Sequence, residues 1–140
     1  MKLSSLSLQK IKKLLRTSGV YLCTGKFVSC IKTPIPSVAP DLLGLYRDYP
    51  LAANDEFADF HVNLTYPKTL RRWFRPQVLF YLDKVTPFKP LSAEQAFPVL
   101  EWGLNWCIAS RIKNELIVHA SVVEKNGKAL IMPGMSGSGK

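Results

Sequence analysis

The last seven residues carry the clearest chemistry in the sequence: Gly134-Met135-Ser136-Gly137-Ser138-Gly139-Lys140 follow the pattern G-x-x-x-x-G-K. This pattern predicts a phosphate-binding loop, in which successive backbone N–H groups converge on an anion and glycine removes the Cβ that would obstruct its approach. Lys140 would place its ammonium on the β- and γ-phosphates of a nucleotide. The Ser or Thr that binds Mg²⁺ in the complete pattern would come after Lys140, so we predict no metal ligand within this fragment.

The segment before this loop has the pattern of a β-hairpin. An apolar, β-rich run at 116–123 is followed by Asn126-Gly127, the pair that most strongly favours a type I′ turn, and then by a second apolar run at 128–132. In an ordinary P-loop protein the strand before the loop has parallel neighbours, whereas here an antiparallel strand precedes it.

The turn fixes which residues would face each other. With Asn126-Gly127 at the tip, Val123 faces Leu130 and His119 faces Gly134, the first residue of the loop. His119 is therefore a candidate catalytic residue that could contact the γ-phosphate or assist proton transfer. The alternative is a half-buried strand histidine that donates to a backbone carbonyl, and the sequence leaves both open.

Upstream, the sequence predicts α/β structure. The expected elements are an amphipathic helix over 3–15, strands at 19–23 and 27–31 joined through Thr24-Gly25-Lys26, a short helix from Asp41 to Arg47, strands at 57–64 and 78–82, and a helix over 93–113 with Ser92 starting a capping box. We expect two domains: residues 1–115 as an accessory α/β region and residues 116–140 as the truncated start of a P-loop domain.

Composition excludes several classes of protein. The chain has 140 residues, 47% of them apolar, and a net charge of +9, which fits a folded domain and not a disordered chain. No run is long and apolar enough to span a bilayer, and no secretory signal is visible, so we predict a cytoplasmic protein. The cysteines Cys23, Cys30 and Cys107 lack the spacing of a zinc site and are expected to be reduced.

Other residues have a plain structural explanation. Lys68, Arg71, Arg72 and Arg75 surround Trp73 and Phe74, a pattern that could bind nucleic acid, but we prefer a solvated loop whose aromatic rings pack inward and predict no nucleic-acid partner. For Trp102 and Trp106, one helical turn apart, we predict core packing. His61 has no chemical neighbour in the sequence and is expected to be structural.

Three longer strings resemble a known family. The loop with its preceding hairpin and histidine looks like the catalytic domain of HPr kinase/phosphorylase, and FADFHVNL (57–64), LRRWFRPQVLFYLD (70–83) and LEWGLNWCIASR (100–111) resemble the HPr-kinase-related kinase A proteins of bacteria. The resemblance covers the chain from about Leu15. It implies a fold shared with ATP-dependent phosphoenolpyruvate carboxykinase, ATP or a related donor, Mg²⁺, a protein phosphoacceptor and a possible homo-oligomer.

The sequence departs from HPr kinases in two respects. Ala120 stands where those enzymes have glycine after the histidine, and residues 1–115 differ from their N-terminal domain, so we do not expect HPr itself to be the acceptor. The resemblance to the related kinases implies a small PqqD-like protein as the candidate partner instead. We therefore expect a kinase that transfers the γ-phosphoryl group to a protein hydroxyl, the fragment itself being inactive. The alternatives are a regulatory module that binds nucleotide without phosphotransfer and a basic RNA-associated protein.

Overall fold

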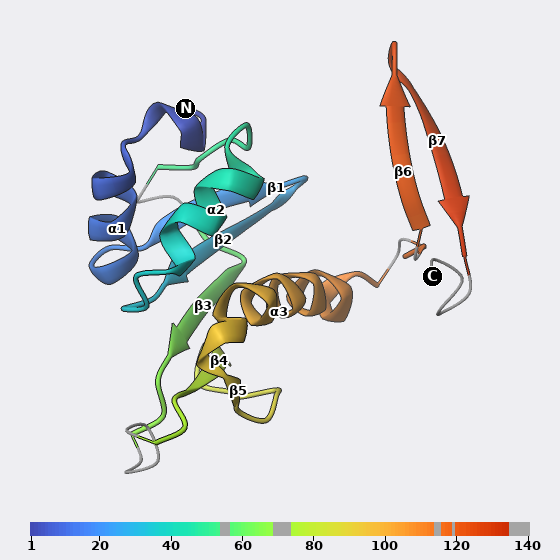
Figure 1. Cartoon of the computed structure of the whole chain (residues 1–140). Helices are drawn as coiled ribbons and strands as arrows, with labels where there is room; N and C mark the ends of the chain where they lie inside the picture. Colours follow the sequence, from blue (N-terminus) through green and yellow to red (C-terminus); the bar gives the residue numbers. More distant parts are fainter. Residues whose placement is uncertain (54–56, 69–73, 114–115, 119, 135–140) are drawn as a thin grey trace. The chain divides into compact units, whose positions relative to one another are not determined.

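The computed structural model of the chain describes residues 1–53, 57–68, 74–113, 116–118 and 120–134. The chain divides into two compact units, residues 1–110 and residues 111–140. In the described part, the first unit carries a five-stranded sheet with three α-helices and the second a two-stranded hairpin (Figure 1). At this coarse level the α/β class predicted from the sequence is confirmed, while the assignment of residues 1–115 as an accessory domain stays a prediction.

The first unit is built on a mixed sheet whose strand order is β1-β2-β3-β4-β5. The strands are β1 (Val20–Thr24), β2 (Phe27–Lys32), β3 (Phe60–Thr65), β4 (Gln77–Leu82) and β5 (Leu91–Ser92). β2 and β3 run parallel and the other neighbours antiparallel. The predicted hairpin of β1 and β2 is confirmed with a shorter turn than expected, because Thr24 already pairs with Phe27 and only Gly25 and Lys26 connect the strands.

The helices are α1 (Leu8–Arg16), α2 (Val38–Tyr46) and α3 (Ala96–Arg111), with single 3-10 turns η1 (Leu3–Ser5) and η3 (Ala93–Gln95). α1 begins where the Ser7 hydroxyl accepts a hydrogen bond from the Lys10 N–H at 3.2 Å, which satisfies one of the free donors at the helix start. Ile11 and Leu15 of α1 are buried, as the apolar stripe of the N-terminal segment predicts.

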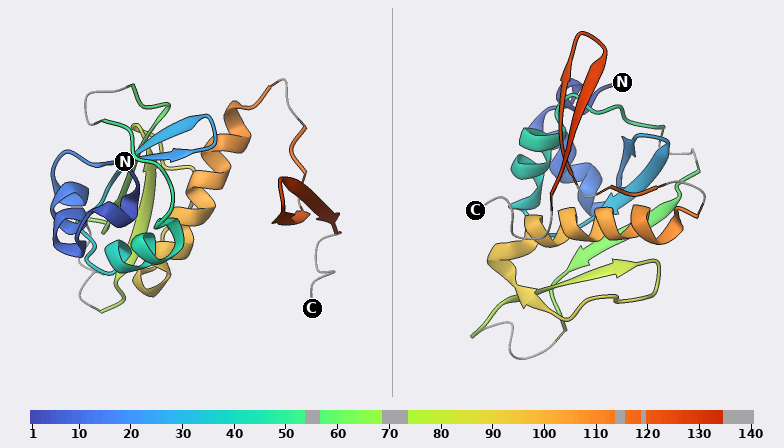
Figure 2. Two further views of the ribbon diagram at one scale, coloured as in Figure 1. Left: turned by 90° about the horizontal axis from the view of Figure 1, so that it is seen from above. Right: turned by 90° about the vertical axis from the view of Figure 1, so that its right-hand side faces the viewer.

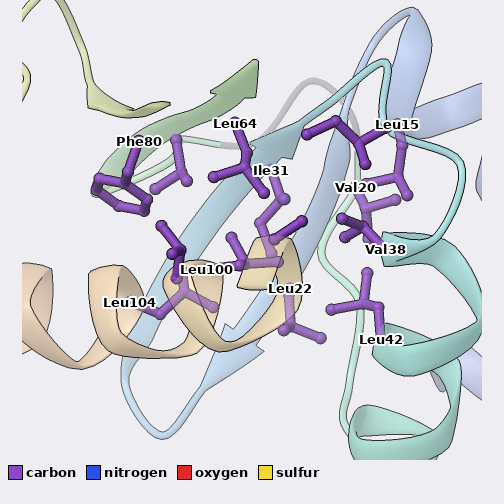
Figure 3. Close-up of a cluster of buried hydrophobic side chains, with 14 of the residues drawn as sticks. Leu15, Val20, Leu22, Ile31, Val38, Leu42, Leu64, Phe80, Leu100 and Leu104 are labelled. Carbon is purple, nitrogen blue, oxygen red and sulfur yellow. The ribbon is translucent and has the colours of Figure 1, made fainter. Parts of the chain in front are cut away.

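The core of the first unit lies between one face of the sheet and the helices (Figure 3). Along β3 every second residue is buried, at Phe60, Val62 and Leu64, while His61 and Asn63 are exposed. The register places buried residues of all four longer strands on this face, because residues two apart in a strand share a side of the sheet. The helices close it with Leu15, Val38, Leu42, Leu100 and Leu104, which Figure 3 shows pointing into this cluster.

One glycine explains how closely α3 approaches the sheet. A Cβ added to Gly103 would lie 2.0 Å from Cε2 of Phe80, a ring of β4 that is itself 1% exposed. Gly103 therefore makes room for the Phe80 ring against the helix backbone, and this contact fixes α3 over β4.

Several expectations about local structure are wrong in detail. The helix expected over 3–15 is interrupted, because Leu3–Ser5 form a 3-10 turn, Leu6 is extended and α1 begins only at Leu8. α2 starts at Val38 and not at Asp41, which lies within the helix; Pro40 is tolerated because residues of the first turn need no N–H partner. The Ser92 side chain makes no capping hydrogen bond; Ser92 ends β5, and a 3-10 turn separates it from α3. The strand predicted from Leu116 begins, among described residues, at Ala120.

The predicted burial of several aromatic residues is also wrong. Trp102 and Trp106 are 53% and 36% exposed, and both contact the ring of Phe88, which stacks on Trp102 with centroids 4.2 Å apart. Phe74 is 88% exposed and does not pack inward, while Trp73 lies outside the described residues. The helical period placed the two tryptophans correctly on one side of α3, but they lie outside Phe88, a ring that packs against the core, and the helix residues buried in the core include Leu100, Leu104 and Cys107.

The structure describes all three cysteines, and none of them is in a disulfide, in agreement with the expected reduced thiols. Cys23 and Cys30 lie on β1 and β2 but are not paired with each other, because Cys23 faces Val28 and Cys30 faces Tyr21. Among the helices of the described residues, none has the length and apolar character needed to cross a membrane.

Candidate functional site

The hairpin before the candidate phosphate-binding loop forms as the sequence predicts. β6 (Ala120–Lys125) pairs antiparallel with β7 (Lys128–Pro133), and the predicted pair that lies within described residues is observed: Val123 faces Leu130. The rest of the register follows from the same turn, with Val122 opposite Ile131 and Lys125 opposite Lys128. The described pairing ends at Ala120 and Pro133. The predicted register is thus confirmed over the whole described hairpin.

The turn has the backbone geometry that this register requires. Asn126 and Gly127 both have positive φ, 54° and 74°, which is the combination a type I′ turn needs. The Gly127 N–H donates to a carboxylate oxygen of Glu124 at 2.7 Å. Asn126 tolerates this region better than other non-glycine residues, and Gly127 adopts it without a steric penalty, so the two residue types explain the tight reversal.

The hairpin exposes apolar side chains on both faces. Opposite residues share a face, so Val122 and Ile131 lie on one side and Val123 and Leu130 on the other, each between 55% and 62% exposed. A strand with apolar residues on both faces is typical of the interior of a sheet covered on both sides. Within the described residues, this hairpin thus has the residue pattern of a sheet interior without the neighbours that would cover it.

The residues with the predicted chemistry fall largely outside the described part of the chain. His119 and the loop residues Met135, Ser136, Gly137, Ser138, Gly139 and Lys140 lie outside it; Gly134, directly after β7, is described. The structure therefore places the scaffold of the candidate site and its first glycine, and the predicted roles of the remaining residues stay predictions.

The other histidine lies on the first unit, next to an acid that the sequence did not single out. His61 Nδ1 is 3.7 Å from Asp83 Oδ1, and the Asp83 N–H donates to the His61 carbonyl oxygen at 2.9 Å. Both side chains are more than half exposed, at 61% and 53%. Asp83 follows β4 with a φ of 54°, a conformation that aspartate tolerates better than most residues. The antiparallel pairing of β3 with β4 brings the two together, and this pairing was not predictable from local sequence.

The structure brings no metal-binding cluster to the His61–Asp83 pair within the part of the chain that it describes. No group of three or more His, Cys, Asp or Glu residues suited to a metal occurs among the residues that the structure describes. The exposed His61–Asp83 pair makes only a weak ion pair at most, since solvent screens both partners. His61 is thus a surface residue, and its expected structural role stays a prediction.

The strongest electrostatic perturbation in the described structure joins two helices. The Tyr46 hydroxyl of α2 donates to a carboxylate oxygen of Glu101 of α3 at 2.5 Å. Burial of Tyr46, followed by this hydrogen bond and by the negative charge of Glu101, raises the pKa of the phenol well above its ordinary value. The pair ties α2 to α3, and it offers no free nucleophile because the hydroxyl proton is held by the carboxylate.

Comparison with known proteins gives no match: no protein-family model, no curated protein and no solved structure is similar to this chain. The resemblance to the HPr-kinase-related proteins thus rests on the sequence strings alone, and the candidate site rests on the loop pattern and on the hairpin that leads into it.

Proposed function

We propose that this chain contributes the phosphate-binding loop of an ATP-dependent kinase, with Gly134 to Lys140 around the β- and γ-phosphates of ATP·Mg²⁺. The observation that carries the proposal is the hairpin register, because β7 leads directly into the glycine of a G-x-x-x-x-G-K pattern. In such loops the strand supplies a rigid support and the following backbone N–H groups bind the anion. Supporting this, the strand has the two-sided apolar pattern of a sheet interior.

The same register supports a role for His119. The last described pair is Ala120 with Pro133, so one further step of the same register would set His119 opposite Gly134. Pro133 has no N–H to donate, so this step would depend on the remaining backbone groups. An imidazole at the entrance of the loop would hold or move a proton near the transferring phosphate. We propose a protein hydroxyl as the acceptor, in line with the family resemblance.

Nucleotide binding by the protein encoded by the whole gene tests the loop assignment. We expect Lys140→Ala to weaken the binding of a fluorescent ATP analogue with Mg²⁺ by about 10- to 150-fold, the range for a lost hydrogen bond to a charged group. Lys128→Ala is the matched control, since Lys128 lies on β7 beside the turn and is exposed. Equal affinity of the Lys140→Ala variant and the parent protein would refute the loop assignment.

Phosphate transfer separates the kinase from the regulatory alternative. His119→Ala should leave nucleotide affinity within about threefold and slow the transfer of labelled γ-phosphate to protein by about 10²- to 10⁴-fold, the usual contribution of general acid–base catalysis. A parent protein that binds ATP·Mg²⁺ but transfers no phosphate to any co-purified or added protein would instead be a nucleotide-binding regulatory module.

A further inference from the structure

Three aromatic rings of the first unit gather at its surface. Trp102 and Trp106 of α3 are exposed, although tryptophan is a residue that folded proteins bury to a high degree on average. Both contact Phe88, which lies in the segment that links β4 to β5, and α3 runs alongside β4 and this segment (Figure 2). Phe88, Trp102 and Trp106 are called the aromatic cluster below. Large apolar side chains that gather on a surface are typical of a binding site.

The rings of the aromatic cluster are held in place by the core. Phe88 packs on the core, with its ring centroid 5.6 Å from that of Phe80. The Phe88 ring stacks on Trp102 at an interplanar angle of 16° and meets the Trp106 ring at 76°. Phe88 covers one face of the Trp102 indole, and since Trp102 is 53% exposed, the opposite face is open to solvent. Another planar ring would extend this stack without any movement of the core.

The charges beside the aromatic cluster favour an anionic ligand. Lys84 and Lys89 belong to the same linking segment as Phe88, Lys89 directly after it, and both are exposed. Neither forms an ion pair with a described residue. Asp83, the acid of this segment, lies beside His61 at 3.7 Å. The other exposed residues on the tryptophan side of α3 are uncharged: Pro98, Asn105 and Ala109. The cluster thus combines an open ring face with two positive charges, which attract an anion.

We infer that the aromatic cluster binds single-stranded nucleic acid, with a base stacked on the open face of Trp102 and the adjoining phosphates near Lys84 and Lys89. Every base has a π-face, so rings flanked by cations bind single strands with little dependence on sequence. The flexible stem of a lysine lets its ammonium follow the phosphate that carries the stacked base. A proline-rich peptide would also use aromatic rings, but it would leave the two lysines without a role.

This inference departs from the expectation that the protein has no nucleic-acid partner. That expectation concerns residues 68–75 and goes together with buried tryptophans, whereas the structure exposes Trp102 and Trp106 on a different surface. The inference does not depend on the proposed nucleotide site. Lys140→Ala should therefore leave the binding of single-stranded nucleic acid unchanged while it weakens the binding of ATP·Mg²⁺, and the two proposals can fail separately.

A labelled oligonucleotide of about ten uridines, within the usual length of a single-strand site, is the probe. Its binding to the full chain is followed by fluorescence anisotropy. We expect Trp102→Ala to weaken binding by about 5- to 150-fold, the range for the loss of one stacked base, and Trp102→Phe, which keeps a ring, to weaken it less. Phe74→Ala is the matched control and should stay within about threefold of the parent protein, because Phe74 is 88% exposed but lies beside Arg75 in the other basic region.

Three outcomes of this experiment would overturn the inference. The first is a parent protein that does not bind the oligonucleotide. The second is equal affinity of Trp102→Ala and the parent protein, and the third is a loss of binding in Phe74→Ala alone, which would place the nucleic acid at residues 68–75. Binding of a proline-rich peptide that Trp102→Ala abolishes, with no binding of the oligonucleotide, would assign the aromatic cluster to a protein partner instead.

The salt dependence of binding tests the two lysines and leaves the rings intact. Each phosphate contact with a single strand contributes about −0.7 to the slope of log affinity against log salt concentration. Replacing both lysines, with Lys84→Ala and Lys89→Ala, should therefore make the slope shallower by about 1.4, the sum for two contacts. Lys10→Ala with Lys13→Ala, two exposed lysines of α1, should leave the slope unchanged. Equal slopes for the parent protein and the variant without Lys84 and Lys89 would overturn the inference, even if Trp102→Ala does not fold.

Discussion

The two units of this protein divide packing and predicted chemistry between them. Residues 1–110 bury a continuous apolar core between a sheet and three helices. The described strands of residues 111–140 bury almost nothing, yet they lead into the loop sequence with the clearest predicted chemistry. A motif can thus be recognised in a segment that buries few side chains, because the pattern consists of residues chosen for backbone conformation, such as glycine, and not of core residues.

The contrast also shows which kind of evidence each unit offers. In the first unit, burial and register explain the apolar residues of the core, whereas others, such as Phe57 and Val85, are exposed. The question left open there is which surface is used. In the second, the register explains where the loop begins, and apolar residues such as Val122 and Leu130 have no cover among the described residues. A two-stranded hairpin is only marginally stable alone, so it needs neighbours to hold a site rigidly.

The largest effect is expected when an apolar side chain is truncated to alanine in the first unit, and a truncation in the hairpin provides the comparison. Phe60→Ala removes a ring with 0% exposure and should lower the free energy of unfolding of the first unit by about 3–5 kcal/mol. Val122→Ala truncates a side chain that is 60% exposed and should change the free energy of unfolding of the first unit by less than about 0.5 kcal/mol. Urea denaturation followed by tryptophan fluorescence reports on the first unit, which contains all the tryptophans.

The outcome of this comparison is informative in both directions. A loss of several kcal/mol from Val122→Ala would mean that the hairpin is covered in the intact protein and that the two units fold together. A small loss from Phe60→Ala would contradict the core described for the first unit.

The next largest effect tests the approach of α3 to the sheet. Gly103→Ala adds a methyl group that would overlap the Phe80 ring at 2.0 Å and should destabilise the first unit by about 1–3 kcal/mol or more. Phe80→Leu in the same background should recover part of this loss, because the smaller side chain leaves room for the new Cβ. Thermal unfolding of the single and double variants measures the coupling, and strictly additive losses would argue against this contact.

Much of this fold follows from the sequence, and the exceptions have a common cause. The turns at Gly25 and at Asn126-Gly127 and the apolar stripe of α1 are local signals, and they gave the right elements. Trp102 and Trp106 were assigned to the core because aromatic rings usually are buried. Which side of α3 faces the sheet depends on Gly103 and Phe80, residues far apart in the chain, and local periodicity cannot provide that information.

For the candidate site too, local features could be predicted from the sequence and contacts between distant residues could not. The register of β6 and β7 could be worked out from the turn alone, since the side-chain period of strands is two. Asp83 beside His61 could not, because it depends on which strand pairs with β3.

A smaller effect is expected at the tip of the hairpin. Gly127 has a φ of 74° with nothing within 4 Å of an added Cβ, so Gly127→Val meets backbone strain and no clash. We expect a loss of about 1–2 kcal/mol from the hairpin and weaker cross-strand NOEs between Val123 and Leu130. The spectrum of the first unit should stay unchanged. If signals of core residues such as Leu100 shift as well, the two units are coupled.

The smallest expected effect is on the pH dependence of stability, and it tests whether α2 and α3 pack together in the first unit. The pKa of Tyr46 is raised in the folded protein, by burial first and by Glu101 second, above the ordinary value of 10.0 that applies to the unfolded chain. Above about pH 10 the unfolded state therefore loses a proton that the folded state keeps. The stabilisation is complete below pH 10 and is lost as the pH rises from there, by at most about 1.4 kcal/mol per pH unit and by less to the extent that solvent reaches the phenol.

Tyr46→Phe keeps the edge contact with the Tyr49 ring and removes this ionisation. Its free energy of unfolding should fall less steeply than that of the parent protein between pH 10 and pH 11, while lysines titrate equally in both. Parallel curves for the two proteins would mean that solvent reaches the Tyr46 hydroxyl freely and that its hydrogen bond to Glu101 does not hold α2 against α3.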